Sequence, residues 1–137
     1  MKKTLVLFAA TLLLAATAAQ ASDKARIAVI GDLDTLYVGQ AGYCGERTWV
    51  ERKAWQGIFV DGGERTWLHM NAKLRTPTLW YDCKGEYSFV PQREKAYIVR
   101  YSIAGEQCHF HLFRVVPGGD PVPEELTHEQ SRSCLAK

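Results

Sequence analysis

The chain has no long apolar segment after its first twenty residues, so nothing later in it approaches the roughly 20 apolar residues of a membrane-spanning helix. Near the start, Lys2 and Lys3 precede an apolar run over residues 5–16, and the small residues Ala19 and Ala21 follow it. This order is typical of a secretory signal peptide. The sequence therefore predicts a signal peptide over residues 1–21, a single mature domain over residues 22–137, and a periplasmic or secreted location without a membrane span.

The predicted mature domain also lacks an excess of charge of either sign. Lys2 and Lys3 belong to the signal peptide, which leaves 15 of the 17 basic residues to balance 15 acidic ones. No basic stripe with interleaved aromatic side chains runs through the sequence, so nucleic acid is not an expected partner. Net neutrality likewise gives no reason to expect attraction to anionic lipid.

No two cysteines are spaced as Cys-x-x-Cys, the pattern of thioredoxin-type redox sites. The four cysteines, Cys44, Cys83, Cys108 and Cys134, all lie in the predicted mature domain. An even number of cysteines in an exported chain predicts two disulfides, because the compartment is oxidising. Their wide spacing makes a four-thiolate zinc site the less favoured alternative.

No segment repeats apolar residues with the 3.6-residue period of an amphipathic helix. Short runs rich in Val, Ile, Tyr, Phe and Trp alternate instead with turn residues, which indicates an all-β chain. We predict a single antiparallel β-sandwich of the immunoglobulin or transthyretin-like kind, with two disulfides and a Pro/Gly-rich C-terminal tail. The expected strands cover residues 25–30, 35–38, 48–50, 55–61, 65–70, 74–80, 86–90, 95–103 and 107–116.

Turn signals place these strands relative to one another. Asp61-Gly62-Gly63 predicts a hairpin between the two strands that flank it, because glycine reaches positive φ without steric cost. Pro77 makes its segment an edge strand or an interrupted one, and Lys84-Gly85 predicts a turn. The tail over residues 117–137 is expected to stop the sheet and to hold a short helix over residues 123–131.

Residues 79–116 form the most strand-rich part of the chain and are expected to fold as a four-stranded antiparallel meander. Cys83 and Cys108 would then lie at the same end of one sheet, which favours the pairing Cys83–Cys108. Cys44–Cys134 would then be the second disulfide and would link the C-terminal tail to the sandwich. The other two pairings of four cysteines remain open at this point.

The sequence contains no Gly-x-Ser-x-Gly motif. His109-Phe110-His111 is the most suggestive local pattern, because residues two apart on a strand project from the same face. These two imidazoles, with His69 as a third ligand, form a candidate zinc or copper site. The interpretation that we favour is a half-polar sheet face, with no metal, no cofactor and no catalytic residue. A hydrolase whose catalytic residues meet only in the fold stays open.

Aromatic side chains indicate a possible function more strongly than the histidines do. Exposed Trp and Tyr on a β-sandwich can stack on sugar rings or anchor a protein partner, whereas core packing is their default role. Tyr37, Tyr43 and Trp49 flank a glycine-rich loop over residues 39–45, and loops carry recognition more often than strands do. These three residues are the predicted binding surface.

The phrase from Cys83 to Pro91 (CKGEYSFVP), followed by residues 95–99 (KAYIV) and then by Cys108, resembles small exported bacterial domains. These are transthyretin-like β-sandwiches of uncharacterised function. The resemblance covers about residues 83–116. It implies a non-catalytic envelope protein and assigns no functional residue.

These observations predict an exported, non-catalytic binding protein of the bacterial envelope, whose partner is a protein or a cell-wall glycan. A periplasmic inhibitor or immunity protein that blocks an exported toxin or hydrolase is the main alternative. An unrecognised hydrolase or a metal-binding protein is the second.

Overall fold

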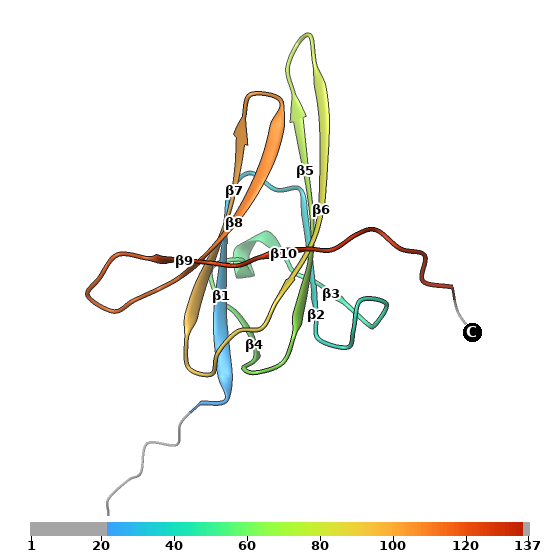
Figure 1. The fold of residues 1–137 in the computed structure, drawn as a ribbon. Helices are drawn as coiled ribbons and strands as arrows, with labels where there is room; N and C mark the ends of the chain where they lie inside the picture. The colour runs from blue at the N-terminus through green and yellow to red at the C-terminus, as the bar shows by residue number, and fades with distance from the viewer. Residues whose placement is uncertain (1–21, 136–137) are drawn as a thin grey trace, which may run out of the picture.

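The computed structural model describes residues 22–135, which form ten strands and one short 3₁₀ helix (Figure 1). The predicted signal peptide lies outside these residues. No helix in the described part of the chain is long and apolar enough to span a membrane. In chain order the elements are β1 (Lys24–Ile30), β2 (Thr35–Gly39), β3 (Thr48–Trp49), η1 (Arg52–Ala54), β4 (Ile58–Asp61), β5 (Thr66–Arg75), β6 (Trp80–Phe89), β7 (Ala96–Ala104), β8 (Gln107–Arg114), β9 (Val122–Glu124) and β10 (Thr127–His128).

The strands form two five-stranded sheets that enclose one core. Sheet A has the order β4-β1-β7-β8-β9, and sheet B has the order β10-β6-β5-β2-β3. Neighbouring strands pair antiparallel except β1 and β7, which run parallel. The all-β sandwich predicted from the sequence is therefore confirmed, with one parallel pair in an otherwise antiparallel arrangement.

Alternation of side chains along each strand directs one face of each sheet into the core. In β5, Leu68, Met70 and Ala72 are buried, while Trp67 and His69 face outward, as the alternation predicted. Strands β1 and β7 supply the opposite wall from sheet A in the same way. The core includes Ile27, Val29, Leu36, Leu68, Met70, Tyr97, Val99 and Leu112.

Strand β6 runs without interruption through Lys84-Gly85, where the sequence predicted a turn. Both residues pair with β5. Gly85 serves close packing and not a turn, because a Cβ at this position would collide with the rings of Tyr87 and Phe110. The predicted four-stranded meander is therefore wrong, since its first two segments are one strand of sheet B and its last two belong to sheet A.

The turn prediction at residues 61–63 is also wrong. Asp61-Gly62-Gly63 does not close a hairpin, because it carries the chain from β4 in sheet A to β5 in sheet B. Gly63 has φ +83°, and its N–H donates to the Pro91 carbonyl at 2.7 Å. Pro77 lies in the turn between β5 and β6, so the expected strand over residues 74–80 is interrupted, which is one of the two outcomes that the proline predicted. Thr76 and Leu79 close that turn, each N–H donating to the other's carbonyl, at 2.8 and 3.3 Å.

The C-terminal tail adds a strand to each sheet, where the sequence predicted a stop and a helix over residues 123–131. Strand β9 pairs with β8 at the edge of sheet A, and β10 pairs with β6 at the edge of sheet B. Pro123 is tolerated in β9 because an edge strand needs only one ladder of hydrogen bonds. Figure 1 shows the tail crossing from one sheet to the other.

Both predicted disulfides are present, which fits an oxidising compartment. Cys44–Cys134 joins the loop after β2 to the tail, with Cα atoms 5.4 Å apart. Cys83–Cys108 joins β6 of sheet B to β8 of sheet A, with Cα atoms 6.2 Å apart. The pairing is confirmed, but the expected geometry is wrong, because Cys83 and Cys108 lie on opposite sheets and not at one end of a single sheet.

We expect the double variant Cys83→Ala/Cys108→Ala to lower the free energy of unfolding by about 3 kcal/mol, because this disulfide restricts the unfolded chain. Urea denaturation of the mature protein measures the loss. A peptide map under non-reducing conditions gives the pairing independently, and an unchanged urea midpoint would contradict a covalent link between the sheets.

Candidate functional site

Four side chains form a row across the outer face of sheet B, one from each of β3, β2, β5 and β6. Trp49 lies opposite Tyr37. Tyr37 in turn lies opposite His69, which lies opposite Glu86. Tyr37, His69 and Glu86 alternate with inward residues of their own strands, and the register of β3 against β2 places Trp49 beside Tyr37. We call Trp49, Tyr37, His69 and Glu86 the outer row.

The β3 end of the outer row is an exposed aromatic pair. Trp49 exposes 54% of its surface and Tyr37 exposes 37%. The Val50 N–H donates to the Leu36 carbonyl at 2.9 Å, so the adjacent positions Tyr37 and Trp49 form a non-hydrogen-bonded pair, the closer of the two antiparallel pair types. The Tyr37 ring also meets the His69 ring edge-on, with centroids 6.2 Å apart. Two neighbouring aromatic rings therefore face solvent on a rigid sheet.

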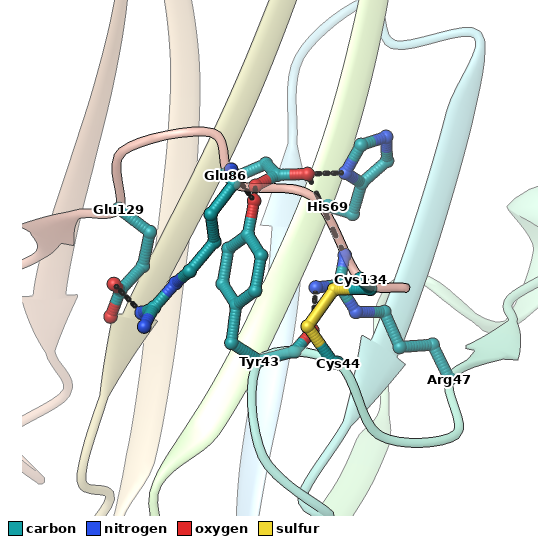
Figure 2. The surroundings of a disulfide bond; sticks show 8 residues. Tyr43, Cys44, Arg47, His69, Glu86, Glu129 and Cys134 are labelled. Atoms are coloured by element: carbon teal, nitrogen blue, oxygen red, sulfur yellow. Dashed lines mark hydrogen bonds and ion pairs between the residues drawn. A yellow bond between two sulfur atoms is a disulfide. The ribbon is translucent and has the colours of Figure 1, made fainter. Parts of the chain in front are cut away.

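The β6 end of the outer row is a hydrogen-bonded carboxylate (Figure 2). The Tyr43 hydroxyl donates to Glu86, and His69 Nδ1 lies 2.8 Å from Glu86 Oε1. Arg47 Nη1 lies 3.8 Å from the same oxygen. Burial by itself would raise the pKa of Glu86, but the hydrogen bonds from Tyr43 and His69, with the charges of His69 and Arg47, outweigh it and lower that pKa. The site therefore favours an ionised carboxylate.

The ionised carboxylate determines what His69 offers to a ligand. A carboxylate only accepts hydrogen bonds, so His69 Nδ1 carries the proton in this contact. In the neutral imidazole, Nε2 is then an acceptor. Figure 2 shows this second nitrogen directed away from Glu86.

The C-terminal tail and the Cys44–Cys134 disulfide cover the Glu86 end of the outer row. The Arg132 N–H donates to the Tyr43 hydroxyl at 3.1 Å, and the Arg132 guanidinium lies over the Tyr43 ring, 4.3 Å from its centroid. Glu129 holds the tail in place, accepting from the Ser88 hydroxyl at 2.5 Å and pairing with Arg132 at 3.3 Å. Only a shallow cavity of about 260 Å³ remains between the loop and the tail. The outer row is thus covered at its Glu86 end and open at its Trp49 end.

The three predicted binding residues occupy two different environments. Tyr37 and Trp49 face solvent side by side, as a binding surface requires. Tyr43 is only 8% exposed and lies beneath Arg132, so it supports the carboxylate from inside and does not offer its ring to a ligand.

The histidines considered as metal ligands do not meet. His109 and His111 stack on the outer face of sheet A, with ring centroids 6.0 Å apart. His69 lies on the outer face of sheet B, so the core of the sandwich separates it from them. Among residues 22–135, no three His, Cys, Asp or Glu side chains are grouped as metal ligands would be. The fold therefore does not bring together the candidate set of His69, His109 and His111, which was the less favoured interpretation of the sequence.

Sequence reasoning missed Glu86, Arg47, Glu129 and Arg132. The outward direction of His69 was readable from the alternation in β5. Its partner Glu86 could not be predicted, because the contact between the two side chains depends on the register of β5 against β6. The expected turn at Lys84-Gly85 also hid the position of Glu86 in a long strand.

Comparison with known proteins found no matching family model, no similar curated protein and no similar solved structure. The transthyretin-like resemblance therefore stays a prediction, and functional inference depends on the fold and on the geometry of the outer row.

We expect Glu86→Gln to remove a pH-dependent part of the stability. The folded state lowers the pKa of Glu86, so its ionised form stabilises the fold at pH values above about 4.3, the ordinary pKa of an unfolded glutamate. This contribution is lost as the pH falls below that value and through the lowered folded pKa. The urea midpoints of the wild type and of Glu86→Gln should therefore approach each other as the pH is lowered through this range.

Glu125→Gln, at an exposed carboxylate of the tail, is the matched control and should follow the wild-type profile. A difference between wild type and Glu86→Gln that does not vary with pH would contradict the assigned role of Glu86.

Proposed function

We propose that this protein is an exported, non-catalytic binding protein that recognises cell-wall glycan through the aromatic end of the outer row. The observation that carries the proposal is the exposed pair of Trp49 and Tyr37, adjacent on neighbouring strands. Rings of this kind offer a large, rigid apolar surface on which the C–H face of a sugar can stack.

Polar groups beside the aromatic pair supply the directional contacts that a sugar needs. His69 follows Tyr37 in the outer row and offers Nε2 to a hydroxyl group, as an acceptor in the neutral imidazole and as a donor in the charged one. Glu86 fixes the orientation of that imidazole, and Tyr43 and Arg47 in turn hold Glu86. A sugar can therefore stack on the aromatic rings and hydrogen-bond to an imidazole of set orientation.

Rigidity of the scaffold supports a binding role. Trp49 and Tyr37 project from paired strands, and the loop between β2 and β3 is tied to the tail by Cys44–Cys134. Side chains that are already ordered lose less conformational entropy when a partner binds.

The contacts of Ser88 favour binding over hydrolysis. Ser88 lies two residues beyond Glu86 on the same face of β6 and is the hydroxyl residue next to the His69–Glu86 pair on that strand. Its hydroxyl donates to Glu129 and accepts from Arg65 Nη1 at 2.9 Å, and the side chain is fully buried. Ser88 therefore fastens the tail and is not free to attack a substrate.

The second candidate function is a periplasmic inhibitor or immunity protein. The same aromatic pair favours it, because Trp and Tyr are enriched among the residues that contribute most to protein–protein affinity. In this alternative the Trp49 end of the outer row anchors an exported toxin or hydrolase.

The glycan proposal predicts that soluble peptidoglycan fragments bind the mature protein and change its tryptophan fluorescence. We expect Trp49→Ala to lower the affinity measured by calorimetry by about tenfold or more, since buried aromatic anchors carry much of a binding free energy. Trp49 is exposed, so this change should leave the urea midpoint unaltered.

Phe59→Ala is the matched control, because Phe59 is 66% exposed and lies on the other sheet. It should bind fragments as the wild type does. Absence of any heat with peptidoglycan fragments would contradict the glycan proposal. One-to-one capture of an exported hydrolase or toxin, lost in Trp49→Ala, would then favour the inhibitor.

A further inference from the structure

Strands β7 and β8 bring four hydrogen-bonding side chains together on the outer face of sheet A. Arg100 lies opposite His111, and Ser102 lies opposite His109. Residues two apart on a strand share a face, so these four positions form a rectangle, roughly 5 Å across the strands and roughly 7 Å along them. We call Arg100, Ser102, His109 and His111 the donor cluster.

The side chains of the donor cluster can all donate to one anion. The two imidazoles stack, with ring centroids 6.0 Å apart and an angle of 17° between the ring planes. Each imidazole carries an N–H, and in the charged form both ring nitrogens donate. Two N–H···O bonds of about 2.9 Å, to different oxygens of one oxyanion, can span this separation. Arg100 adds N–H donors in a planar fork that matches phosphate geometry, and Ser102 adds a hydroxyl.

No carboxylate occupies these donors. Among residues 22–135, no Asp or Glu pairs with Arg100, His109 or His111. Other arginines of the sandwich do pair with carboxylates, namely Arg47, Arg52, Arg93, Arg114 and Arg132. The donor cluster is therefore left free to accept an anion from outside the chain.

Acidic residues near the donor cluster in the sequence are directed elsewhere or make no contact with it. Asp32 pairs with Arg52 at 3.7 Å. Desolvation, followed by the charge and hydrogen bond of Glu106, raises the pKa of Tyr81 in β6, so Glu106 faces sheet B. Asp120, in the loop before β9, does not pair with Arg100 in the described part of the chain.

An apolar cavity adjoins the donor cluster. It has a volume of about 250 Å³ and is lined by Ile98, Phe113 and Pro121, together with Arg100. The Phe113 ring lies 6.4 Å from the His111 ring between centroids, and the Arg100 guanidinium carbon lies 5.6 Å from the Phe113 centroid. Apolar walls beside a few convergent polar groups are typical of sites for small organic ligands. The arrangement therefore suits a ligand with one anionic end and one apolar end.

The same geometry disfavours a metal ion at the two imidazoles. The Arg100 guanidinium opposite His111 would repel a cation, whereas it attracts an anion. Among residues 22–135, no third His, Cys, Asp or Glu joins His109 and His111 as a ligand would. Charge and ligand number both favour an anion at this site.

We propose that the donor cluster and the adjoining cavity bind an organic phosphate monoester. The phosphate oxygens accept hydrogen bonds from Arg100 and the two imidazoles, with Ser102 beside them, and the organic group lies against Ile98 and Phe113. A phosphate has more terminal oxygens than a carboxylate, so it can use donors on both strands at once. The site lies on sheet A and the outer row on sheet B, so this binding is independent of the proposed glycan recognition.

Calorimetry with the mature protein tests this proposal at about pH 6, where histidine is commonly charged. Phenyl phosphate should bind one-to-one, and the affinity should fall as salt is raised. Inorganic phosphate should bind about tenfold more weakly or less, because it leaves the apolar cavity empty. Phenol, which lacks the anionic group, should give no measurable heat.

Arg100→Gln should lower the affinity for phenyl phosphate by about tenfold or more, because it removes charge-assisted hydrogen bonds. Arg75→Gln is the matched control, since Arg75 is also an exposed arginine that lies over an aromatic ring, that of Trp80 in sheet B. It should bind phenyl phosphate like the wild type, and so should Trp49→Ala, which impairs only the proposed glycan site. Both arginine variants should keep the wild-type urea midpoint, because both side chains are exposed.

The histidines report where the ligand binds. Phenyl phosphate should shift the imidazole NMR signals of His109 and His111 and leave those of His69 and His128 in place, because the latter two belong to sheet B. Phe113→Ala should lower the affinity for phenyl phosphate toward that of inorganic phosphate and leave the affinity for inorganic phosphate unchanged.

Absence of heat with both phosphates would overturn the proposal, as would an unchanged affinity in Arg100→Gln or NMR shifts confined to His69 and His128. Equal affinities for phenyl phosphate and inorganic phosphate would overturn the assignment of an organic ester, because the cavity would then take no part. Binding of zinc chloride that His111→Gln abolishes, without any phosphate binding, would assign the two imidazoles to a metal instead.

Discussion

The pairing of β5 with β6 is the constraint on which the rest of the structure depends. Ten residues of one strand lie opposite ten of the other, from Thr66 opposite Phe89 to Arg75 opposite Trp80. Burial of Leu68, Met70 and Ala72 sets which face of β5 points inward. If one strand slipped by one residue, its inward side chains would turn to the outer face relative to those of the partner strand. Burial of the core residues therefore holds the register.

This one register positions three features that lie far apart along the hairpin. It brings His69 beside Glu86 on the outer face, and it directs Cys83 toward sheet A, where Cys108 meets it. At the far end it pairs Arg75 with Trp80. The His69–Glu86 contact, the position of Cys83 and the Arg75–Trp80 pair are thus consequences of the same hydrogen-bond ladder.

The tail and the loop after β2 cover edges of the two sheets that the pairing of β5 with β6 does not cover. Strands β9 and β10 pair with the exposed edges of β8 and β6, one in each sheet. At the edge of sheet A formed by β4, the Gln40 side-chain amide bonds both the N–H and the carbonyl of Asp61 at 2.9 Å. Unpaired edges invite association with other chains, so these contacts protect the sandwich as well as stabilise it. The tail also covers the Tyr43–Glu86 contact and leaves Trp49 and Tyr37 open.

The sequence by itself determined the all-β class and the number of disulfides, because strand propensity, alternation and cysteine count are local properties. It favoured the correct pairing only through a meander that the fold does not contain, so the tertiary structure decided which cysteines meet. The sequence also determined that Trp67 and His69 face away from Leu68 and Met70. Only the tertiary structure decided that Lys84-Gly85 continues a strand, since the need for glycine there comes from the rings of Tyr87 and Phe110 packed against it. Likewise, the outer row and the separation of His69 from His109 and His111 follow from strand order and register. Strand order and register depend on contacts between residues distant in the chain, which no local sequence pattern encodes.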